Sequence, residues 1–268
     1  MARSVEPVVE RAARAVSRLL AFLIFGFLVL PVLAVIPLSF SSNSILTYPM
    51  PGLSIDWYRK VLTQDIWRNA FTNSLYIAAS TVLLSVTLGT LAALGLDRCG
   101  PRVRKVMALL FIAPMMVPVV LTAVGLFFFF ASVGMVGTYS ALILSHTLIA
   151  TPFVVISVSA SLAKFDRTLI KAAQSLGAGP VRTFFKVSMP LLAPGLISGA
   201  LFAFAASLDE LIITLFVGSP SQRTIPRQMF SGVRENIDPT IIAAAAILTL
   251  ISIIMMSVSM MLQNRQRK

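Results

Sequence analysis

The segment Lys164–Pro190, KFDRTLIKAAQSLGAGPVRTFFKVSMP, is a polar stretch between two apolar ones. It carries too many charges for the core of a bilayer, yet it contains helix-forming runs. The run Lys171–Leu176 consists of residues that form or tolerate a helix, and Gly177 and Pro180 end it. A second short helical run leads to Pro190, which suits the first turn of a further helix. The pattern predicts a helix-turn-helix at a membrane face.

The composition indicates a membrane protein. Hydrophobic residues make up 57% of the 268 residues, charged residues make up 12%, and the mean hydropathy is +0.89. This balance is far from that of a soluble domain. The net charge of +12 could indicate a nucleic-acid partner, but the basic residues lie at the ends of apolar runs. Charges in such positions orient spans in a membrane, so we predict an all-α integral membrane protein that contacts lipid and no nucleic acid.

Six apolar runs are long enough to predict six transmembrane helices. The first is too long for the apolar core of a signal peptide. In the fifth, Gly195 and Gly199 give a small-xxx-small face that favours close helix packing. The predicted spans are residues 19–40, 71–96, 106–131, 139–162, 191–218 and 240–262. The predicted regions are the N-terminus with the first span and an outer loop (1–68), a five-span core (69–262) and a basic tail (263–268).

Six spans place both termini on the same side of the membrane. The N-terminus, the second-to-third loop, the fourth-to-fifth loop and the tail together hold sixteen of the 22 Lys and Arg residues. Because positive residues favour the cytoplasm, both termini and the segment Lys164–Pro190 are predicted to be cytoplasmic.

Within Lys164–Pro190, the pattern K-A-A-x-x-x-G, nine residues and then V-x-M-P resembles the cytoplasmic loop of bacterial ABC importer permeases. That family usually has E-A-A-x-x-x-G, nine residues and I-x-L-P, so Lys171 reverses the charge of the usual Glu. The resemblance implies the type I ABC importer permease fold in a bacterial inner membrane. It also implies that a coupling helix docks into a groove on a separate ATPase. The residues assigned to this coupling loop are Lys171, Ala172, Ala173, Leu176, Gly177 and Pro190. The alternative is an ordinary amphipathic interfacial loop.

Several motifs of catalysis and metal binding are missing. There is no G-x-x-x-x-G-K-[ST] phosphate loop, no H-E-x-x-H and no G-x-S-x-G, so the chain is predicted to be no enzyme. ATP and Mg would then be bound by the partner ATPase, and this chain would hold no cofactor. Lone Cys99 allows no intramolecular disulfide, and no metal site is predicted. The only histidine, His146, could line a pathway or be a packed, hydrogen-bonded imidazole, and it is assigned no role.

Two adjacent carboxyl groups, Asp209 and Glu210, lie in the middle of the fifth predicted span. Each costs on the order of a few kcal/mol at that depth, so exposure to lipid is disfavoured. Neighbouring residues of a helix point about 100° apart. One carboxyl is therefore expected to face a translocation pathway and the other an adjacent helix or subunit. The alternative is that one of them is a structural carboxyl.

The sequence around these carboxyls resembles the spermidine/putrescine subgroup of the same family. The matching pieces are Ser207-Leu208-Asp209-Glu210, then Phe216-Val217-x-x-Pro220, then Thr224-Ile225-Pro226. The resemblance implies a second, homologous permease, an ATPase dimer and a solute-binding protein as partners, with a small polyamine-like solute as cargo. Opines, aminobutyrate and aminophosphonates remain open as cargo.

Two other functions remain open at this stage. An ion-gradient-driven secondary carrier could use Asp209 or Glu210 as a proton site, and a membrane scaffold could bind a partner through its basic loops. Uptake that survives ATP depletion but collapses with a protonophore would indicate the carrier. The scaffold does not explain the two carboxyls.

Overall fold

A computed structural model describes residues 8–164, 166–235 and 238–265, and within them the chain is helical with no β-strand. The predicted all-α class is confirmed for this part of the chain. Some predicted features lie outside the described residues: residues 1–7 of the N-terminal region, Phe165 of the polar segment and residues 266–268 of the tail. The rest of the predicted tail is helical, since the last helix continues to Arg265.

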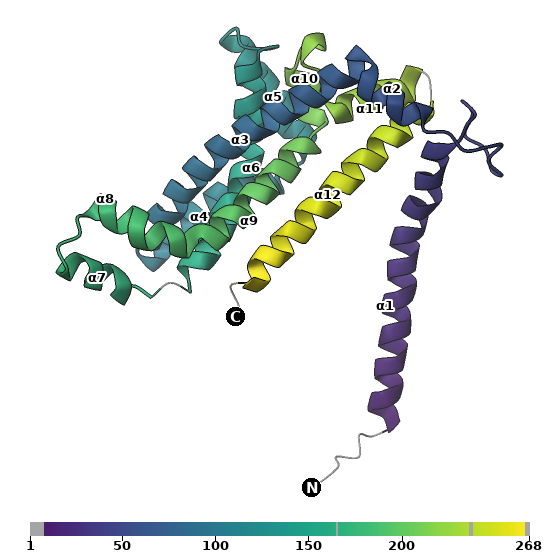
Figure 1. Ribbon diagram of the computed structural model, residues 1–268. Coiled ribbons are helices and arrows are strands. Elements are labelled where there is room, and N and C mark those ends of the chain that lie inside the picture. Colours follow the sequence, from purple (N-terminus) through teal and green to yellow (C-terminus); the bar gives the residue numbers. More distant parts are fainter. Residues whose placement is uncertain (1–7, 165, 236–237, 266–268) are drawn as a thin grey trace.

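Three long helices contact one another at the centre of the bundle (Figure 1): α3 (Asp65–Arg98), α6 (Tyr139–Leu162) and α9 (Met189–Leu208). They meet at small residues. A Cβ atom added at Gly89 of α3 would lie 2.7 Å from the Cβ of Val154 of α6, and one added at Gly199 of α9 would lie 3.0 Å from the Cα of Val154. Close approach through small residues lets helices associate in lipid. The small-xxx-small face predicted at Gly195 and Gly199 does pack against α6.

Five described helical segments are long and apolar enough to cross a membrane. They are Ala13–Phe40, Asp65–Arg98, Tyr139–Leu162, Pro180–Leu208 and Pro239–Val258. Each overlaps a predicted span, and the third predicted span has no single helix. The last of the five lies in α12 (Pro239–Arg265), which runs beside α9.

The third predicted span is broken into two helices. α4 (Pro101–Met116) and α5 (Val119–Ser132) meet at an angle of 97°, and together they can count as one span. The cause lies between them, because a proline disfavours the helical conformation of the residue before it. Val117 accordingly has an extended backbone with ψ 132°, and Pro118 follows it. The span predicted over residues 106–131 thus falls on a bent pair of helices, and it is not a single helix.

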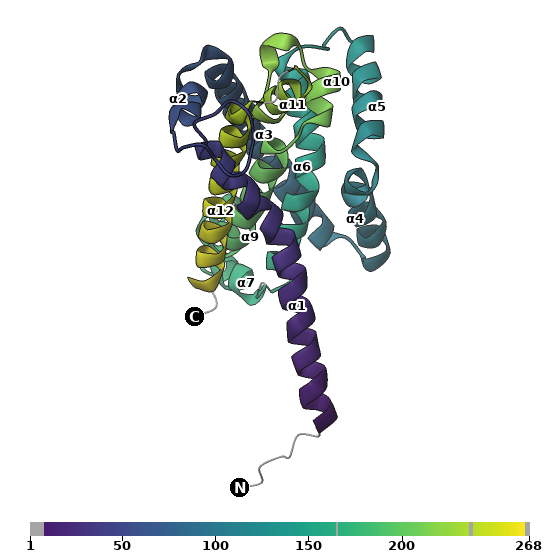
Figure 2. The same cartoon turned by 90° about the vertical axis from the view of Figure 1, so that its right-hand side faces the viewer.

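The first helix, α1 (Val8–Val35), stands apart from the bundle (Figures 1 and 2), and none of its most apolar 18-residue window is buried. Phe22 and Phe27 are 72% and 79% exposed. A 3₁₀ turn, Ile36–Phe40, follows α1 and brings the chain to α12 and to α2 (Asp56–Thr63). An apolar face this large needs lipid or another protein to cover it.

The loops divide between the two ends of the bundle (Figures 1 and 2). α2, α10 (Ile212–Val217) and α11 (Ile225–Glu235) lie at one end. At the other end lie α7 (Thr168–Ser175), α8 (Pro180–Thr183), the start of α1 and the end of α12. The start of α1, the end of α12 and the helices α7 and α8 therefore share one end of the molecule.

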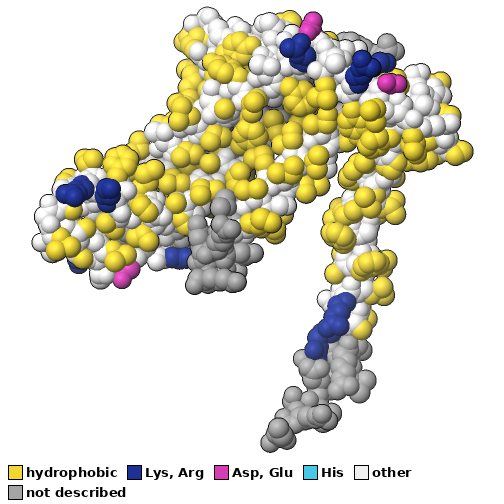
Figure 3. Space-filling model, viewed as in Figure 1, with side chains coloured by type: hydrophobic (Ala, Val, Ile, Leu, Met, Phe, Trp, Pro, Cys, Tyr) yellow, Lys and Arg dark blue, Asp and Glu magenta, His cyan; other side chains and the backbone are white. Residues whose placement is uncertain are grey.

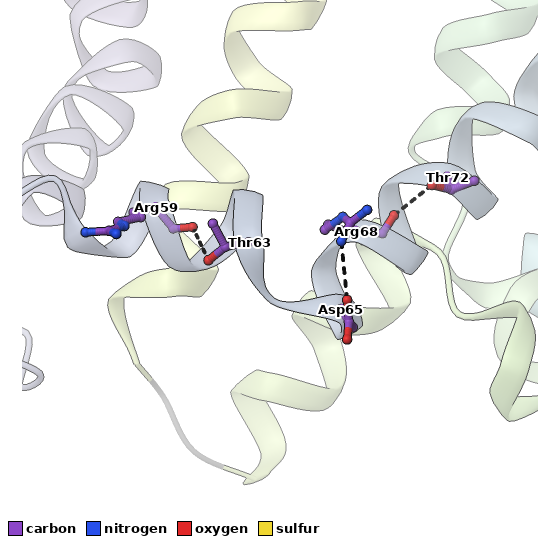
Figure 4. A network of polar contacts seen from close by, with 5 residues as sticks. All are labelled: Arg59, Thr63, Asp65, Arg68 and Thr72. Atoms are coloured by element: carbon purple, nitrogen blue, oxygen red, sulfur yellow. Dashed lines mark hydrogen bonds and ion pairs between the residues drawn. The ribbon is translucent and has the colours of Figure 1, made fainter.

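The corner between α2 and α3 carries charged side chains (Figure 4). It lies at the end of the bundle far from α7 (Figure 1). The Thr63 hydroxyl donates to the Arg59 carbonyl at 2.8 Å, and the Thr72 hydroxyl donates to the Arg68 carbonyl at 2.9 Å. Arg68 pairs with Asp65 one turn earlier at 3.4 Å, with both side chains mostly exposed. These bonds stay within single helices, so they shape the surface without linking elements.

Candidate functional site

The helix-turn-helix at Lys164–Pro190 is built around a left-handed glycine. α7 ends at Ser175, and Gly177 has φ +81°. The Gly177 N–H donates to the Gln174 carbonyl at 2.9 Å, and the Ala178 N–H donates to the Ala173 carbonyl at 3.0 Å. This pair of bonds is a Schellman motif, which closes a helix and needs a residue without a Cβ at the left-handed position. The prediction that Gly177 makes the bend between two short helices agrees with this geometry.

The tip of the helix-turn-helix is apolar and exposed. Leu176 is 88% exposed and Val181 is 69% exposed, at an end of the molecule that also carries basic side chains. Figure 3 shows basic and apolar side chains together at this end of the molecule, at the left of the view, where α7 and α8 lie in Figure 1. Lys171 and Ala172 are exposed on α7, and Ala173 is half-buried. Leu176 and Val181 together leave apolar surface at this end available for a protein contact.

The second short helix does not end before α9. α8 continues through a π-helical turn, Phe184–Ser188, into α9, and the whole stretch Pro180–Leu208 counts as one helix of 29 residues. Pro190 has no N–H to donate and its ring crowds the preceding turn, and a π turn widens the helix at such a point. Pro190 is exposed in a continuous helix, which corrects the expected break before it.

One ion pair joins the start of α7 to the end of α3. The Arg167 guanidinium donates to the Asp97 carboxylate at 2.7 Å. Next to it, the Asp166 carboxylate accepts from the Thr168 N–H at 2.9 Å, and this bond lowers the pKa of Asp166. The helix-turn-helix is therefore tied to a central helix of the bundle.

The two carboxyls of the fifth predicted span lie at a helix break, not within a helix. α9 ends at Leu208, residues 209–211 are not helical, and α10 begins at Ile212. The continuous helix Pro180–Leu208 begins with α8 and ends at the break. The break therefore lies at the end of α9 that is far from α7 and α8 (Figure 1). The expectation that Asp209 and Glu210 sit in mid-helix about 100° apart is therefore wrong. A break exposes backbone groups and suits costly carboxylates better than an apolar helix interior does.

The two carboxyls differ in their surroundings. The half-buried Glu210 carboxylate accepts from the Ile213 N–H at 2.8 Å and so caps the start of α10. Asp209 is exposed, and its carboxylate has no hydrogen bond or ion pair among the described residues. The alternative in which one of the two carboxyls is structural therefore agrees with Glu210, which caps α10. Asp209 has no such role within the described residues.

The only histidine bridges the break. His146 of α6 is fully buried, with Nδ1 2.8 Å from the Ser207 hydroxyl of α9 and Nε2 3.3 Å from the Thr214 hydroxyl of α10. The structure agrees with a packed, hydrogen-bonded imidazole. Sequence reasoning missed its partners, because nothing in the sequence aligns residue 146 with residues 207 and 214. The available signal in the sequence was that two hydroxyl side chains, Ser207 and Thr214, flank the two carboxyls and could bind a buried imidazole.

The loop between α10 and α11 is held by α3. The Asn73 amide donates to the carbonyls of Ser221 and Arg223, both at 3.0 Å, and its oxygen accepts from the Tyr139 hydroxyl at 2.7 Å. The Ile225 N–H donates to the next side chain of α3, Ser74, at 2.8 Å. These bonds, which sequence reasoning missed, fix the loop between α10 and α11 to the central bundle.

An apolar groove of about 520 Å³ adjoins the break. It is bounded by α3, α9, α11 and α12, and its lining includes Tyr76, Phe204 and Leu208, the last helical residue before Asp209. Among the described residues, no three His, Cys, Asp or Glu side chains lie close enough together to hold a metal ion.

Residues 85–268 match the family described as the binding-protein-dependent transport system inner membrane component. The chain belongs to this family of permeases. The putrescine transport system permease protein PotI of Escherichia coli (strain K12) is 35% identical over 249 residues, covering 90% of this chain and 87% of that protein. The spermidine/putrescine transport system permease protein PotC of Haemophilus influenzae is 28% identical, covering 91% of this chain and 95% of that one.

Solved structures with the same fold are also permeases of ABC transporters. A chain from a bacterial ABC transporter that imports the acidic polysaccharide alginate superposes with a TM-score of 0.71 at 15% identity, covering 97% of this chain and 98% of that chain. A chain of the MetNI methionine ABC transporter in inward-facing conformations gives 0.60 at 18% identity, covering 77% and 97%. These likenesses show the fold. This chain is therefore an ABC importer permease subunit, as the resemblance in Lys164–Pro190 implied.

The permease fold separates the predicted residues into two groups. Lys171, Ala172, Ala173, Leu176 and Gly177 lie together in and just after α7 at one end, whereas Pro190 lies further along, at the start of α9. Asp209 and Glu210 lie at the opposite end of the same continuous helix. A single helix thus connects the two groups.

Proposed function

We propose that this permease is one of two homologous membrane subunits of an ATP-driven importer for a small polyamine-like cation. A soluble solute-binding protein would deliver the cation, and the importer would release it into the cytoplasm. The family description and the similarity to putrescine and spermidine/putrescine permeases support this cargo class. The uncovered apolar face of α1 supports contact with lipid and with the second permease.

The observation that carries the proposal is the free carboxylate of Asp209 at the break between α9 and α10. An exposed, unpaired carboxylate at the end of an apolar bundle attracts cations and repels anions. The neighbouring groove, lined by Tyr76 and Phe204, suits the methylene chain of a polyamine. An ammonium group also binds favourably over an aromatic ring. The Asp209 carboxylate and the apolar groove together suit a cation with an aliphatic chain, such as a polyamine.

The energy would come from an ATPase dimer docked on the helix-turn-helix. The exposed Leu176 offers an apolar anchor, and Lys171 and Arg182 offer positive charge around it. Such an anchor with a charged rim is a common form of protein interface. The excess of Lys and Arg at this end supports a cytoplasmic position for the helix-turn-helix and both termini. ATP and Mg would be bound by the ATPase.

Purification of the tagged permease in mild detergent, with mass spectrometry of its partners, tests the assembly. We expect a second permease and a P-loop ATPase, and Leu176→Asp should lose the ATPase while keeping the second permease. If the permease purifies without any ATPase, and uptake survives ATP depletion but collapses with a protonophore, the ion-driven carrier is correct instead.

Uptake of labelled putrescine into cells that lack their other polyamine importers tests the cargo. We expect Asp209→Asn to lower uptake about tenfold or more, since one fixed charge on the path is lost. Glu210→Gln is the matched control, because glutamine keeps the oxygen that caps α10 and should retain most uptake. Normal uptake by Asp209→Asn would contradict the proposed pathway role.

A further inference from the structure

His146 of α6 forms a bridge between the two helices that flank the break. Its ring hydrogen-bonds to Ser207, two residues before Asp209, and to Thr214, two residues into α10. The imidazole is fully buried, as is Thr214, and Ser207 is 4% exposed. Buried hydrogen bonds of this kind are costly to leave unmade, so the three side chains hold one another in place.

One tautomer of the ring satisfies all of these bonds. The Thr214 hydroxyl donates to the Glu210 carbonyl at 3.2 Å. With the ring proton on Nε2, His146 donates to Thr214 and its Nδ1 accepts from the Ser207 hydroxyl. A neutral imidazole thus satisfies both neighbours, and the chain of bonds runs from α9 through α6 to the backbone of the break itself.

This arrangement fixes the direction of the chain at the break. Glu210 accepts two bonds, from the Ile213 N–H to its carboxylate and from the Thr214 hydroxyl to its carbonyl, and both stay within the break and the first turn of α10. The bond between His146 and Ser207 ties that unit to the last turn of α9. Asp209 lies between the two tethered points with no bond from its own carboxylate. Its position is therefore set by its neighbours.

We propose that His146 is a positioning residue that holds the α9–α10 break so that the Asp209 carboxylate points toward the translocation path. The proposal rests on the proposed function, in which Asp209 meets a cationic cargo. His146 itself touches no cargo, because it is fully buried. In this proposal its effect on transport passes through Asp209, whereas a general contribution to folding would not depend on that residue.

The test is a double-mutant cycle with His146→Leu and Asp209→Asn. The complete importer is reconstituted in proteoliposomes, and labelled putrescine uptake is measured per ATP hydrolysed. We expect about a fivefold loss from His146→Leu, as two buried hydrogen bonds are removed. The double variant should transport no less than Asp209→Asn alone. Coupling of this kind is how interacting residues are recognised.

Ser145→Ala is the matched control. Ser145 is the neighbouring residue on α6, is also fully buried, and its hydroxyl donates only to the Ala141 carbonyl of the same helix at 2.7 Å. Its removal should leave uptake per ATP unchanged. If His146→Leu does not assemble, Ser207→Ala removes one of the two bonds and should lower uptake per ATP about two- to threefold. Thr214→Val removes the other bond together with the one to the Glu210 carbonyl, and it should lower uptake per ATP at least as much.

The outcomes separate the two proposals. Normal uptake by Asp209→Asn contradicts the cargo role of Asp209 and, with it, positioning through that residue. Impaired Asp209→Asn with a normal His146→Leu overturns the positioning role alone. Losses that multiply in the double variant also overturn it, because they show that His146 acts independently of Asp209.

Discussion

The Arg167 guanidinium and the Asp97 carboxylate lie 2.7 Å apart and join the start of α7 to the end of α3. The Arg167 side chain is 65% exposed and the Asp97 side chain is 21% exposed. A pair this exposed contributes only about 0–1 kcal/mol to stability. Its consequence is therefore positional, since it ties the helix-turn-helix, the proposed ATPase contact, to a central helix of the bundle.

Removing this pair should weaken the link between ATP hydrolysis and transport. We expect Asp97→Asn to keep ATP hydrolysis but to lower uptake per ATP about threefold, the factor that corresponds to a weak ion pair. The exchanged pair Asp97→Arg with Arg167→Asp should recover much of the loss. Asp65→Asn is the control, because the Asp65–Arg68 pair stays within one helix. An equal loss of uptake per ATP in Asp97→Asn and Asp65→Asn would refute the link.

The left-handed conformation of Gly177 leads to a prediction about binding of the ATPase. Gly177 has φ +81°, a conformation that costs a residue with a Cβ about 1–2 kcal/mol. Gly177→Val should distort the turn and weaken retention of the ATPase in pull-down experiments, whereas Gly177→Asn should be milder. Gly179 has φ −66° and open space around it, so Gly179→Ala serves as the control. Full ATPase retention by Gly177→Val would show that the turn is not needed.

The central packing predicts a contrast between two glycines of α3. A Cβ at Gly89 would lie 2.7 Å from Val154, whereas one at Gly95 would meet nothing within 4 Å. Gly89→Ala should lower the free energy of unfolding by about 1–3 kcal/mol through overpacking. Gly95→Ala should raise it slightly, since alanine favours helix. Thermal melting of the purified protein in detergent measures both changes, and equal melting temperatures would contradict the close packing.

The conformation of the loop between α10 and α11 should depend on Asn73. Asn73→Ala removes three hydrogen bonds, two to the loop carbonyls of Ser221 and Arg223 and one from Tyr139. We expect a cost of about 1–3 kcal/mol and faster amide hydrogen exchange over residues 219–225. Tyr139→Phe removes only the third bond and should accelerate exchange much less. Unchanged exchange in Asn73→Ala would mean that other contacts hold the loop.

Much of the architecture follows from sequence alone because a bilayer requires long apolar helices and places basic residues at particular ends. Five predicted spans correspond to helices, and the turn at Gly177 follows from the need for a residue without a Cβ. The family follows from the spacing of Ala172, Ala173, Gly177 and Pro190. These features are local or depend on composition, so no tertiary contact is needed to predict them.

Tertiary structure decided the rest. Pro118 interrupts the helix locally, but the 97° angle between α4 and α5 and the end of α9 at Leu208 depend on neighbouring helices that satisfy or release backbone groups. The sequence does not show that the Glu210 carboxylate caps α10 while the Asp209 carboxylate has no hydrogen bond among the described residues. His146 acquires partners 61 and 68 residues away only when α6, α9 and α10 come together. Hydrogen bonds across such separations are set by packing, which periodicity and composition do not encode.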